Sequence, residues 1–308
     1  MRILITGGNG FIGRRLRKLI ALSHEVHIAD VRLSNPREES VQSEYFLDVT
    51  DQLETRKLIS DLSPDTIYHM AGKVNFRWSL QEPVKDLLLH TLGTLNVLEA
   101  ARNLNPPPHV IYASSSAIFG NAKIVPTPED CPPSPTSPYG INKWAGEYYC
   151  RTYNQLYGVP ATIMRFTNVY GPTGDHGVIC TFLKKFCQKQ PITLFGGLQK
   201  IQFLYVDDAA TALKLSAEKQ VRGIFNIGGP DMVTLKELVQ LISEEIGFQI
   251  PVQIRPPLQG DIAHTEFDTS KARYELGWEP KFTTRAGLKR YIKWYRRARA
   301  HTSKKGIS

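Results

Sequence analysis

Short apolar runs alternate with stretches of helical periodicity over the first two-thirds of the chain. The apolar runs have the length of buried strands. The predicted strands are RILIT (residues 2–6), EVHIAD (25–30), DTIYHMAG (65–72), HVIYASSS (109–116) and PATIMRF (160–166). The predicted helices between them cover residues 11–22, 52–62, 83–104 and 138–157. Regular alternation of this kind indicates a parallel sheet with helices on both faces.

The alternation of predicted strands and helices ends after residue 171, where turn residues precede a predicted helix over 178–188. Farther on, the pattern predicts a helix over 234–246, a short strand over 251–254 and two terminal helices. We therefore expect an α/β fold: a Rossmann-type, doubly wound parallel sheet with a smaller, mixed α/β C-terminal substrate lobe. The expected nucleotide-binding domain spans residues 1–171 and is rejoined by about 198–228. The expected lobe comprises residues 172–197 and 229–308.

The net charge of +9 is confined to one end of the chain. Residues 285–308 contain nine Lys or Arg and no acid, and without them the chain carries 29 basic and 29 acidic residues. Such an excess is typical of a solvated helix face, so we expect no nucleic-acid or membrane partner. The four cysteines have no metal-ligand spacing, which predicts no metal site and a reducing, cytoplasmic location. We expect neither a signal peptide nor a membrane span.

A glycine pattern follows the first predicted strand and opens the first predicted helix. In TGGNGFIG the glycines are Gly7, Gly10 and Gly13, with Asp30 following 17 residues after the last of them. Glycine permits a tight turn and close approach of the backbone to a pyrophosphate at a helix N-terminus. A carboxylate at the end of the second strand can bond the adenosine ribose and favours NAD over NADP. Arg32 nearby keeps NADP open as the alternative.

A second candidate site lies in SPYGINKWAGEY, where Tyr139 and Lys143 are one helical turn apart. Ser137 and Pro138 can begin that helix, as N-cap and first residue. The spacing places both side chains on one helix face. Because an ammonium favours a neighbouring phenolate, Lys143 is expected to lower the pKa of Tyr139 and make it a general base.

Taken together, the motifs resemble those of the extended short-chain dehydrogenases/reductases. Within that family the chain is most similar to the NAD-dependent nucleotide-sugar epimerases and dehydratases, of the UDP-galactose 4-epimerase type. The resemblance covers nearly the whole chain. It rests on TGGNGFIG, DVTD (48–51), HMAG (69–72), SSSAIFG (114–120), YGINK (139–143), MRFTNVYGP (164–172), FLYVDDAATAL (203–213) and LGWEPKFTTRAGL (276–288).

The resemblance implies roles for individual residues. The implied catalytic set is Ser115, Tyr139 and Lys143. The implied cofactor site comprises Gly7, Gly10, Phe11, Ile12, Gly13, Asp30, Asp48, Val49, Met70, Ala71, Gly72, Tyr139 and Lys143. The implied substrate contacts are Ser115, Ser116, Asn168 and Lys200, with Ser116 as the alternative catalytic serine. Helices 83–104 and 138–157 correspond to those that pair across a two-fold axis, which implies a homodimer.

The residues after Ser115 decide between branches of the family. Dehydratases of the family typically carry acidic side chains there, whereas this chain has Ser116 and Ala117. Neither side chain can shuttle a proton as a carboxylate does. We therefore expect epimerisation of a nucleotide sugar through transient oxidation of a hydroxyl. The alternatives are a dehydrogenase or reductase acting on a ketone or alcohol, a sugar-nucleotide dehydratase, and a protein that holds NAD without turnover.

The chain departs from the family where a diphosphate is usually held. Ile201 and Ala263 stand in the places of two common arginines, and Lys200 lies beside the first. Losing two bidentate clamps leaves the phosphate charges to other basic residues, or indicates a substrate without a diphosphate. The basic alternatives are Lys184, Lys185, Lys200, Arg222 and Arg255. A further departure is His90, where an asparagine is common; a structural role is expected for it.

Overall fold

A computed structural model describes residues 1–33, 42–174, 176–256 and 264–305, with side chains through residue 298. Within these residues the core of the fold is a seven-stranded sheet in which every neighbouring pair is parallel. Its strand order is β10 (Gly223–Ile227), β6 (Ala161–Phe166), β5 (His109–Ser115), β4 (Thr66–His69), β1 (Arg2–Thr6), β2 (Glu25–Asp30) and β3 (Ser43–Phe46). The five strands predicted here are confirmed, and the pattern missed β3 and β10.

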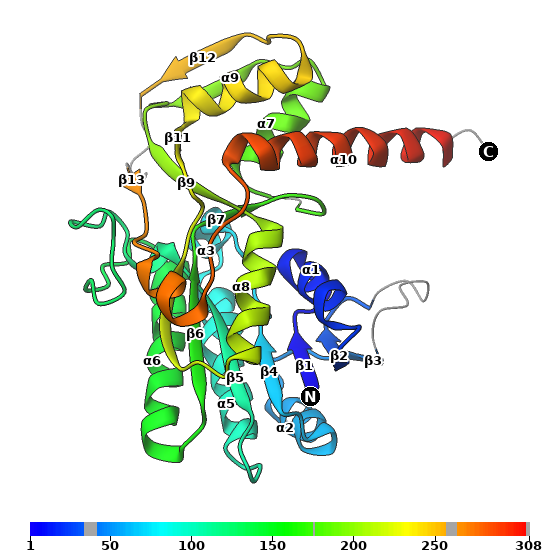
Figure 1. The fold of residues 1–308 in the computed structure, drawn as a ribbon, viewed down its shortest axis with the longest axis vertical. Helices are drawn as coiled ribbons and strands as arrows, with labels where there is room; N and C mark the ends of the chain where they lie inside the picture. The colour runs from blue at the N-terminus through cyan, green and yellow to red at the C-terminus, as the bar shows by residue number, and fades with distance from the viewer. Residues whose placement is uncertain (34–41, 175, 257–263, 306–308) are drawn as a thin grey trace.

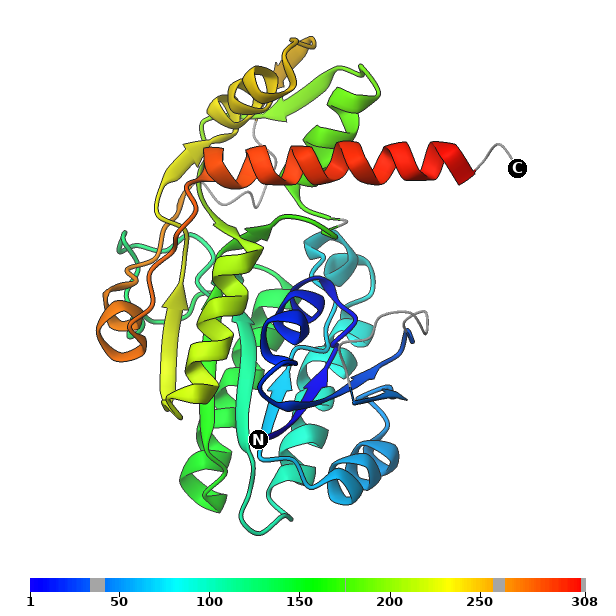
Figure 2. The ribbon, with the colours of Figure 1, turned by 45° about the vertical axis from the view of Figure 1, so that its right-hand side comes forward.

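Helices cover both faces of this sheet (Figures 1 and 2). On one face α1 (Phe11–Ile20) and α8 (Val206–Glu218) pack against each other and against the strands. On the other face lie α2 (Gln52–Leu62), α5 (Gly93–Ala101) and α6 (Pro138–Tyr157). Each face has its own buried apolar cluster, so the strands are apolar on both sides. The doubly wound Rossmann-type architecture is confirmed.

Local signals account for the ends of α6. The Ser137 side chain accepts a hydrogen bond from the Gly140 N–H at 3.1 Å, and Pro138 is the first helical residue. Gly158 ends the helix in the left-handed conformation, with φ of 68°. The predicted N-cap and helix limits are thereby confirmed.

The helix predicted over residues 83–104 is interrupted. The structure has α4 (Pro83–Leu87), one wide turn η1 (Leu88–Leu92) of the π type, and then α5. A Cβ on Gly93 would lie 2.7 Å from the Val49 side chain, so the helix approaches that loop as closely as a glycine allows. Such turns inside α-helices occur frequently at functional sites. A short helix that the pattern missed, α3 (Phe76–Gln81), precedes α4.

Most of the remaining segments form the part of the molecule drawn at the top of Figure 1. They comprise a four-stranded sheet of β7 (Asn168–Tyr170), β9 (Lys200–Tyr205), β11 (Met232–Thr234) and β13 (His264–Thr265), and a pair of β8 (Ile192–Phe195) with β12 (Val252–Arg255). The short η3 (Ala272–Leu276) packs on the first apolar cluster beside α8 and β10, whereas the helices of the smaller part are α7 (Val178–Cys187), α9 (Leu235–Ile246) and α10 (Thr284–Lys305). They enclose a third apolar cluster, which confirms a smaller mixed α/β part.

The boundary between domain and lobe stays a prediction. Of the segment 198–228, strand β10 joins the large sheet through β6, whereas β9 belongs to the small sheet. In the part of the chain described here, no helix is both long and apolar enough to cross a bilayer.

Candidate active site

Four strand ends meet at one edge of the large sheet. Because all its strands are parallel, their carboxyl ends lie in one row along the same end of the sheet, which we call its carboxyl edge. Gly7 follows β1, Asp30 ends β2, Met70 follows β4 and Ser115 ends β5. The chain crosses from β3 over β1 and β2 to β4, so the strand order reverses at this edge beside β1. A reversal of this kind opens a crevice where doubly wound folds bind ligands.

The glycine turn is packed so tightly that side chains have no room. Gly7 has φ of +70°, and a Cβ on it would lie 2.7 Å from the Ala71 backbone. A Cβ on Gly13 would lie 2.6 Å from the Gly7 carbonyl oxygen. The first turn of α1 begins at Gly10 without a side-chain cap or an acidic residue. Its free N–H groups and positive dipole end therefore fit a pyrophosphate, as a dinucleotide requires.

Asp30 is fixed at the expected place beside this turn. The Asn9 N–H donates to Asp30 Oδ2 at 3.0 Å, and the Arg32 N–H donates to Oδ1 at 2.9 Å. Both bonds come from the backbone, so the buried carboxylate keeps further lone pairs for ribose hydroxyls. The residues present fit the adenosine ribose of NAD.

The other residues expected around the cofactor line the same edge. Asp48 is exposed and accepts from the Thr50 N–H and hydroxyl, at 2.9 and 2.8 Å, while Val49 is buried. The remaining members lie half-buried or exposed at the start of α1 and after β4: Phe11, Ile12, Met70, Ala71 and Gly72. The aromatic ring of Phe11 stands edge-on to the ring of His176, with 6.2 Å between the ring centroids.

The Ser115, Tyr139 and Lys143 side chains come together as predicted. Tyr139 and Lys143 are each 5% exposed and lie on one face of α6, toward β5. Ser115 is hydrogen-bonded to Tyr139, and its hydroxyl also accepts from the Ala117 N–H at 3.2 Å. Lys143 Nζ donates to the Ala113 carbonyl at 2.7 Å. Because Ser115 contacts Tyr139 directly, we retain it over Ser116 as the serine of this set.

The expected lowering of the Tyr139 pKa is wrong for this arrangement. Burial raises the pKa of Tyr139 to about 12, against the opposite effect of its hydrogen bond with Ser115. Burial also lowers the pKa of Lys143 to about 8. The ammonium is directed to the Ala113 carbonyl and lies 4.8 Å from the centre of the Tyr112 ring, so desolvation governs the phenol.

Two of the predicted substrate residues, Asn168 and Lys200, lie on the smaller sheet, whereas Ser115 ends β5 of the large sheet and Ser116 follows it. Asn168 is exposed at the start of β7 and is paired with Phe203 of β9. Lys200 is exposed at the start of β9, whereas Ile201 is half-buried and packs on the third apolar cluster. Ala263 lies outside the described residues.

One basic candidate for the diphosphate can be eliminated. Arg222 precedes β10, at the amino ends of the strands, where burial and, to a smaller extent, the Arg222 charge lower the pKa of His109 at the start of β5. That edge is opposite the one where Ser115 lies, so Arg222 cannot reach a ligand held there. Lys184, Lys185 and Arg255 belong to α7 and β12 of the smaller part.

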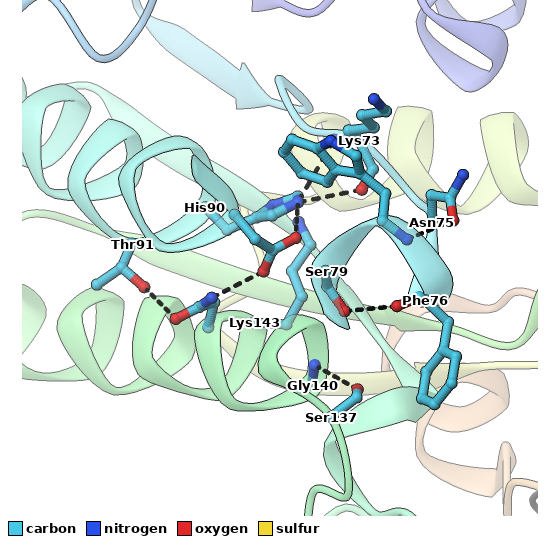
Figure 3. A network of polar contacts seen from close by, with 12 residues as sticks. Lys73, Asn75, Phe76, Ser79, His90, Thr91, Ser137, Gly140 and Lys143 are labelled. Atoms are coloured by element: carbon cyan, nitrogen blue, oxygen red, sulfur yellow. Dashed lines mark hydrogen bonds and ion pairs between the residues drawn. The ribbon is translucent and has the colours of Figure 1, made fainter. Parts of the chain in front are cut away.

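A polar network behind Tyr139 and Lys143 was missed by the sequence analysis. Figure 3 shows His90 between the Lys73 loop and Lys143. Asp86 and Asn142 complete the network, with Asn142 Nδ2 donating to Asp86 Oδ2 at 2.7 Å. The usable signal was the spacing of Asp86 and His90, which places two titratable side chains on one helix face.

A second missed feature is a buried ion pair. Glu147, one turn after Lys143, bonds Arg165 at 2.7 Å, and both side chains are almost fully buried. Arg165 also donates to the Glu129 carbonyl at 2.7 Å. The pair joins α6 to β6 and neutralises the carboxylate that lies next to Lys143 in the helix.

The fold and these side chains define a dinucleotide-dependent enzyme with a Ser-Tyr-Lys set. The family model "NAD dependent epimerase/dehydratase family" matches residues 3–228, and the chain belongs to this family. The three relatives named below are UDP-sugar 4-epimerases. Together they confirm the predicted extended short-chain dehydrogenase/reductase family, NAD as cofactor, and an NAD-dependent nucleotide-sugar epimerase as the enzyme.

Three relatives illustrate the similarity. UDP-glucose 4-epimerase of Mycolicibacterium smegmatis is 30% identical over 313 residues, covering 96% of this chain and 99% of that protein. The structure of UDP-glucose 4-epimerase from Thermotoga maritima with UDP-glucose has a TM-score of 0.88 and 32% identity, covering 97% and 99% of the two chains. UDP-glucuronic acid 4-epimerase from Bacillus cereus, in complex with UDP-glucuronic acid and NAD, has a TM-score of 0.89 and 25% identity, covering 97% and 100%.

Proposed function

We propose that this chain inverts C4 of a UDP-linked sugar. The observation that carries the proposal is the buried Ser115, Tyr139 and Lys143 set at the carboxyl edge of the sheet, beside the glycine turn. The names of the relatives supply the nucleotide and the carbon, and both belong to the proposal. The particular sugar is left to the test below.

Each member of the set has a distinct role. Tyr139 exchanges a proton with the reacting hydroxyl, and Ser115 bonds the same oxygen through both halves of the reaction. Lys143 bonds the ribose next to the nicotinamide and contributes positive charge. When bound, NAD supplies a hydride acceptor and donor and, in its oxidised form, a positive charge beside the phenol. That charge offsets the burial that raises the pKa of Tyr139.

The serine loop supports epimerisation over dehydration. Ser116 and Ala117 begin a short 3₁₀ turn after Ser115, so no carboxylate occupies these positions. The carboxylate of Glu147 is engaged by Arg165. Elimination of water would lack an acid there, whereas inversion requires only that the sugar ketone turn over before reduction.

Lys200 is the proposed partner of the diphosphate. It is exposed at the start of β9, beside the position where the family often has arginine. Lysine neutralises phosphate without gripping it bidentately, so we expect weaker nucleotide binding than an arginine clamp gives. Lys200→Ala should raise the Kd for UDP several-fold. The matched control is Lys18→Ala, because Lys18 is also exposed but lies near the C-terminal end of α1, away from the glycine turn.

The function is tested by incubating the purified protein with UDP-glucose, UDP-galactose, UDP-glucuronate or their N-acetylhexosamine counterparts. Proton NMR of the anomeric and H4 signals then reports inversion without added cofactor. We expect one epimer pair to equilibrate and NAD to remain bound through purification. Conversion that requires stoichiometric NAD(H) would establish the dehydrogenase alternative instead.

We also propose a homodimer formed through α4, η1 and α6. These elements pack side by side, and the face they share carries apolar side chains exposed to solvent. These are Val84, Leu87, Leu88, Ile141, Trp144 and Tyr148, with exposed fractions between 39% and 68%. A second copy related by a two-fold axis would cover them in a four-helix contact. The enzyme is proposed to act in the cytoplasm.

A further inference from the structure

Asp86 and His90 are two fully buried titratable side chains for which the proposed function gives no role. Asp86 is 0% exposed and His90 is 1% exposed. One atom of each lacks a hydrogen-bond partner within the described residues: Asp86 Oδ1 and His90 Nδ1. Buried polar atoms are normally satisfied, so a pair of exceptions in contact with a catalytic set requires a reason.

His90 lies between Tyr139, the proposed base, and the segment after β4 that contains Gly72 and Lys73. Its ring stands edge-on to Tyr139, with 5.2 Å between centroids and an angle of 81°. Its Cε1 would lie 2.7 Å from a Cβ built on Gly72, and Nε2 is 3.2 Å from the Lys73 carbonyl oxygen. The imidazole thus spans from α6 to the segment that follows β4.

The imidazole is neutral in this position. Burial lowers the pKa of His90 well below its ordinary value, and the charge of Lys143 acts in the same direction. Nε2 lies 3.2 Å from the Lys73 carbonyl oxygen and 3.4 Å from the Lys73 backbone nitrogen, so the neutral ring bonds the Lys73 backbone in either tautomer. His90 therefore contributes shape and one hydrogen bond, and it adds no charge.

Asp86 supplies the charge that His90 lacks: burial raises the pKa of its carboxyl, and the hydrogen bond from Asn142 and the charge of Lys143 act in the opposite direction. Its Oδ2 accepts from Asn142 at 2.7 Å, and its Oδ1 lies 3.6 Å from His90 Nε2. The carboxylate raises the pKa values of both Tyr139 and Lys143. For Tyr139 it adds to the larger effect of burial, and for Lys143 it opposes that larger effect. It is thus coupled electrostatically to both members of the catalytic pair.

Among the charged groups around Lys143, Asp86 is the carboxylate without a cationic partner of its own. Glu147 is bonded to Arg165 from β6, so its charge is already neutralised. The titratable groups that interact with Lys143 in the described structure are Asp86 from α4, His90 from η1, His69 from β4, Tyr112 from β5, and Glu147 and Cys150 from α6 itself. The Asp86 carboxylate makes no direct ion pair with Lys143 in the described structure, so it acts on the ammonium as a counter-charge at longer range.

We propose that Asp86 and His90 are positioning residues of the catalytic pair. The carboxylate is a counter-charge of Lys143, and the imidazole, packed between the Tyr139 ring and the segment after β4, holds that ring in place. The proposal rests on the roles given to Tyr139 and Lys143 above. It does not require a particular sugar.

The decisive test is the pH dependence of NAD binding in Asp86→Asn, measured by calorimetry without any sugar. The amide keeps the shape and an acceptor for Asn142 but removes the charge. Without that charge Lys143 loses its proton at lower pH, so the alkaline loss of NAD affinity should move down by about one pH unit or more. With the native UDP-sugar substrate, both limbs of the rate profile should shift the same way, since the pKa of Tyr139 falls too.

An Asp86→Asn protein whose binding profile keeps the native midpoint overturns the counter-charge role, whatever its affinity. If this variant does not fold, Asp86→Ser, which also retains an acceptor, gives the same measurement. Because NAD binding is the readout, a native protein that epimerises nothing refutes the proposed function and leaves this test intact.

The role of His90 is tested by replacing its ring. His90→Ala should lower kcat at least tenfold with little change in KM for the sugar nucleotide, and His90→Phe, which restores a ring edge for Tyr139, should recover part of that loss. Equal losses in both variants would overturn the positioning role. His109→Ala is the matched control: it removes another buried imidazole, bonded to Thr162 at 2.7 Å at the opposite sheet edge, and should leave kcat unchanged.

Discussion

Tyr139 and Lys143 lie one helical turn apart, and burial moves their pKa values in opposite directions. Desolvation favours the uncharged form of each group, which is the phenol for one and the amine for the other. Burial therefore disfavours charge on both side chains, but Lys143, with a pKa of about 8, still carries its charge at neutral pH. Tyr139, with a pKa of about 12, keeps its proton at neutral pH in the chain alone, and we expect bound NAD to favour its release.

Tyr139→Phe should keep the fold and NAD affinity while lowering turnover by about 10²–10⁴-fold. The substitution removes one oxygen, and with it the proton transfer and the bond to Ser115. Turnover by NMR and NAD binding by calorimetry measure the two properties separately. Near-native turnover would place the base elsewhere.

The pKa of Lys143 predicts an alkaline limit of activity. Because the charged form exists below its pKa of about 8, positive charge in the site is retained at neutral pH and lost as the pH rises through that value. Turnover and NAD affinity should therefore both decline above about pH 8. In Lys143→Met both should be low at neutral pH, and the alkaline decline should be absent. A native NAD affinity that is flat to pH 10 would contradict the assignment.

At this scale the sequence identified which residues meet but not their protonation. Spacing was sufficient to bring Tyr139 and Lys143 to one face, because helix geometry is local. The direction of the Tyr139 pKa shift depends on its enclosure by β5 and η1, and the sequence pattern does not report this tertiary contact. Asp86 was missed for the same reason, since a lone carboxylate on a helix is usually solvated.

Among the elements, the β1–α1 turn is the one whose sequence most fully determined its structure. The glycines are required by the left-handed φ at Gly7 and by the close approach of Ala71 and of the turn's own backbone. The wide turn η1 is the opposite case, because the apolar period over residues 83–104 predicts one continuous helix and gives no sign of the turn. The approach of Gly93 to Val49, a tertiary contact, accompanies the break.

Gly7→Ala and Gly158→Ala separate backbone strain from crowding. Their φ values are +70° and +68°, so each alanine costs about 1–2 kcal/mol of stability in the left-handed conformation. A Cβ at Gly158 meets nothing within 4 Å, whereas at Gly7 it meets the Ala71 backbone. Overpacking should add about 1–3 kcal/mol for Gly7→Ala and reduce NAD affinity at least tenfold. Urea unfolding and calorimetry on both variants check this; equal effects would contradict it.

For the molecule as a whole, the sequence predicted the large sheet well and the smaller part only in outline. Parallel strands buried on both faces produce long apolar runs that are easily recognised. Strands β7, β11 and β13 have two or three residues each, too short for a period to appear. Edge strand β3 was missed because its residues are half-buried or exposed.

The last prediction concerns assembly. If α4, η1 and α6 form the dimer contact, a carboxylate in the middle of that face must be desolvated without a partner, which is costly. Ile141→Glu, at a position 50% exposed in the single chain, should therefore convert a dimer to a monomer at micromolar concentration. Leu53→Glu, at a position 76% exposed on α2, is the matched control and should leave the dimer intact.

Light scattering coupled to size exclusion distinguishes the outcomes. A native protein that is already monomeric, or an Ile141→Glu protein that stays dimeric, would contradict the contact proposed here. Because α6 carries both Ile141 and the catalytic pair, loss of the dimer should also lower turnover while NAD binding to the sheet edge persists. The size of that loss measures how far α6 depends on its partner for its position.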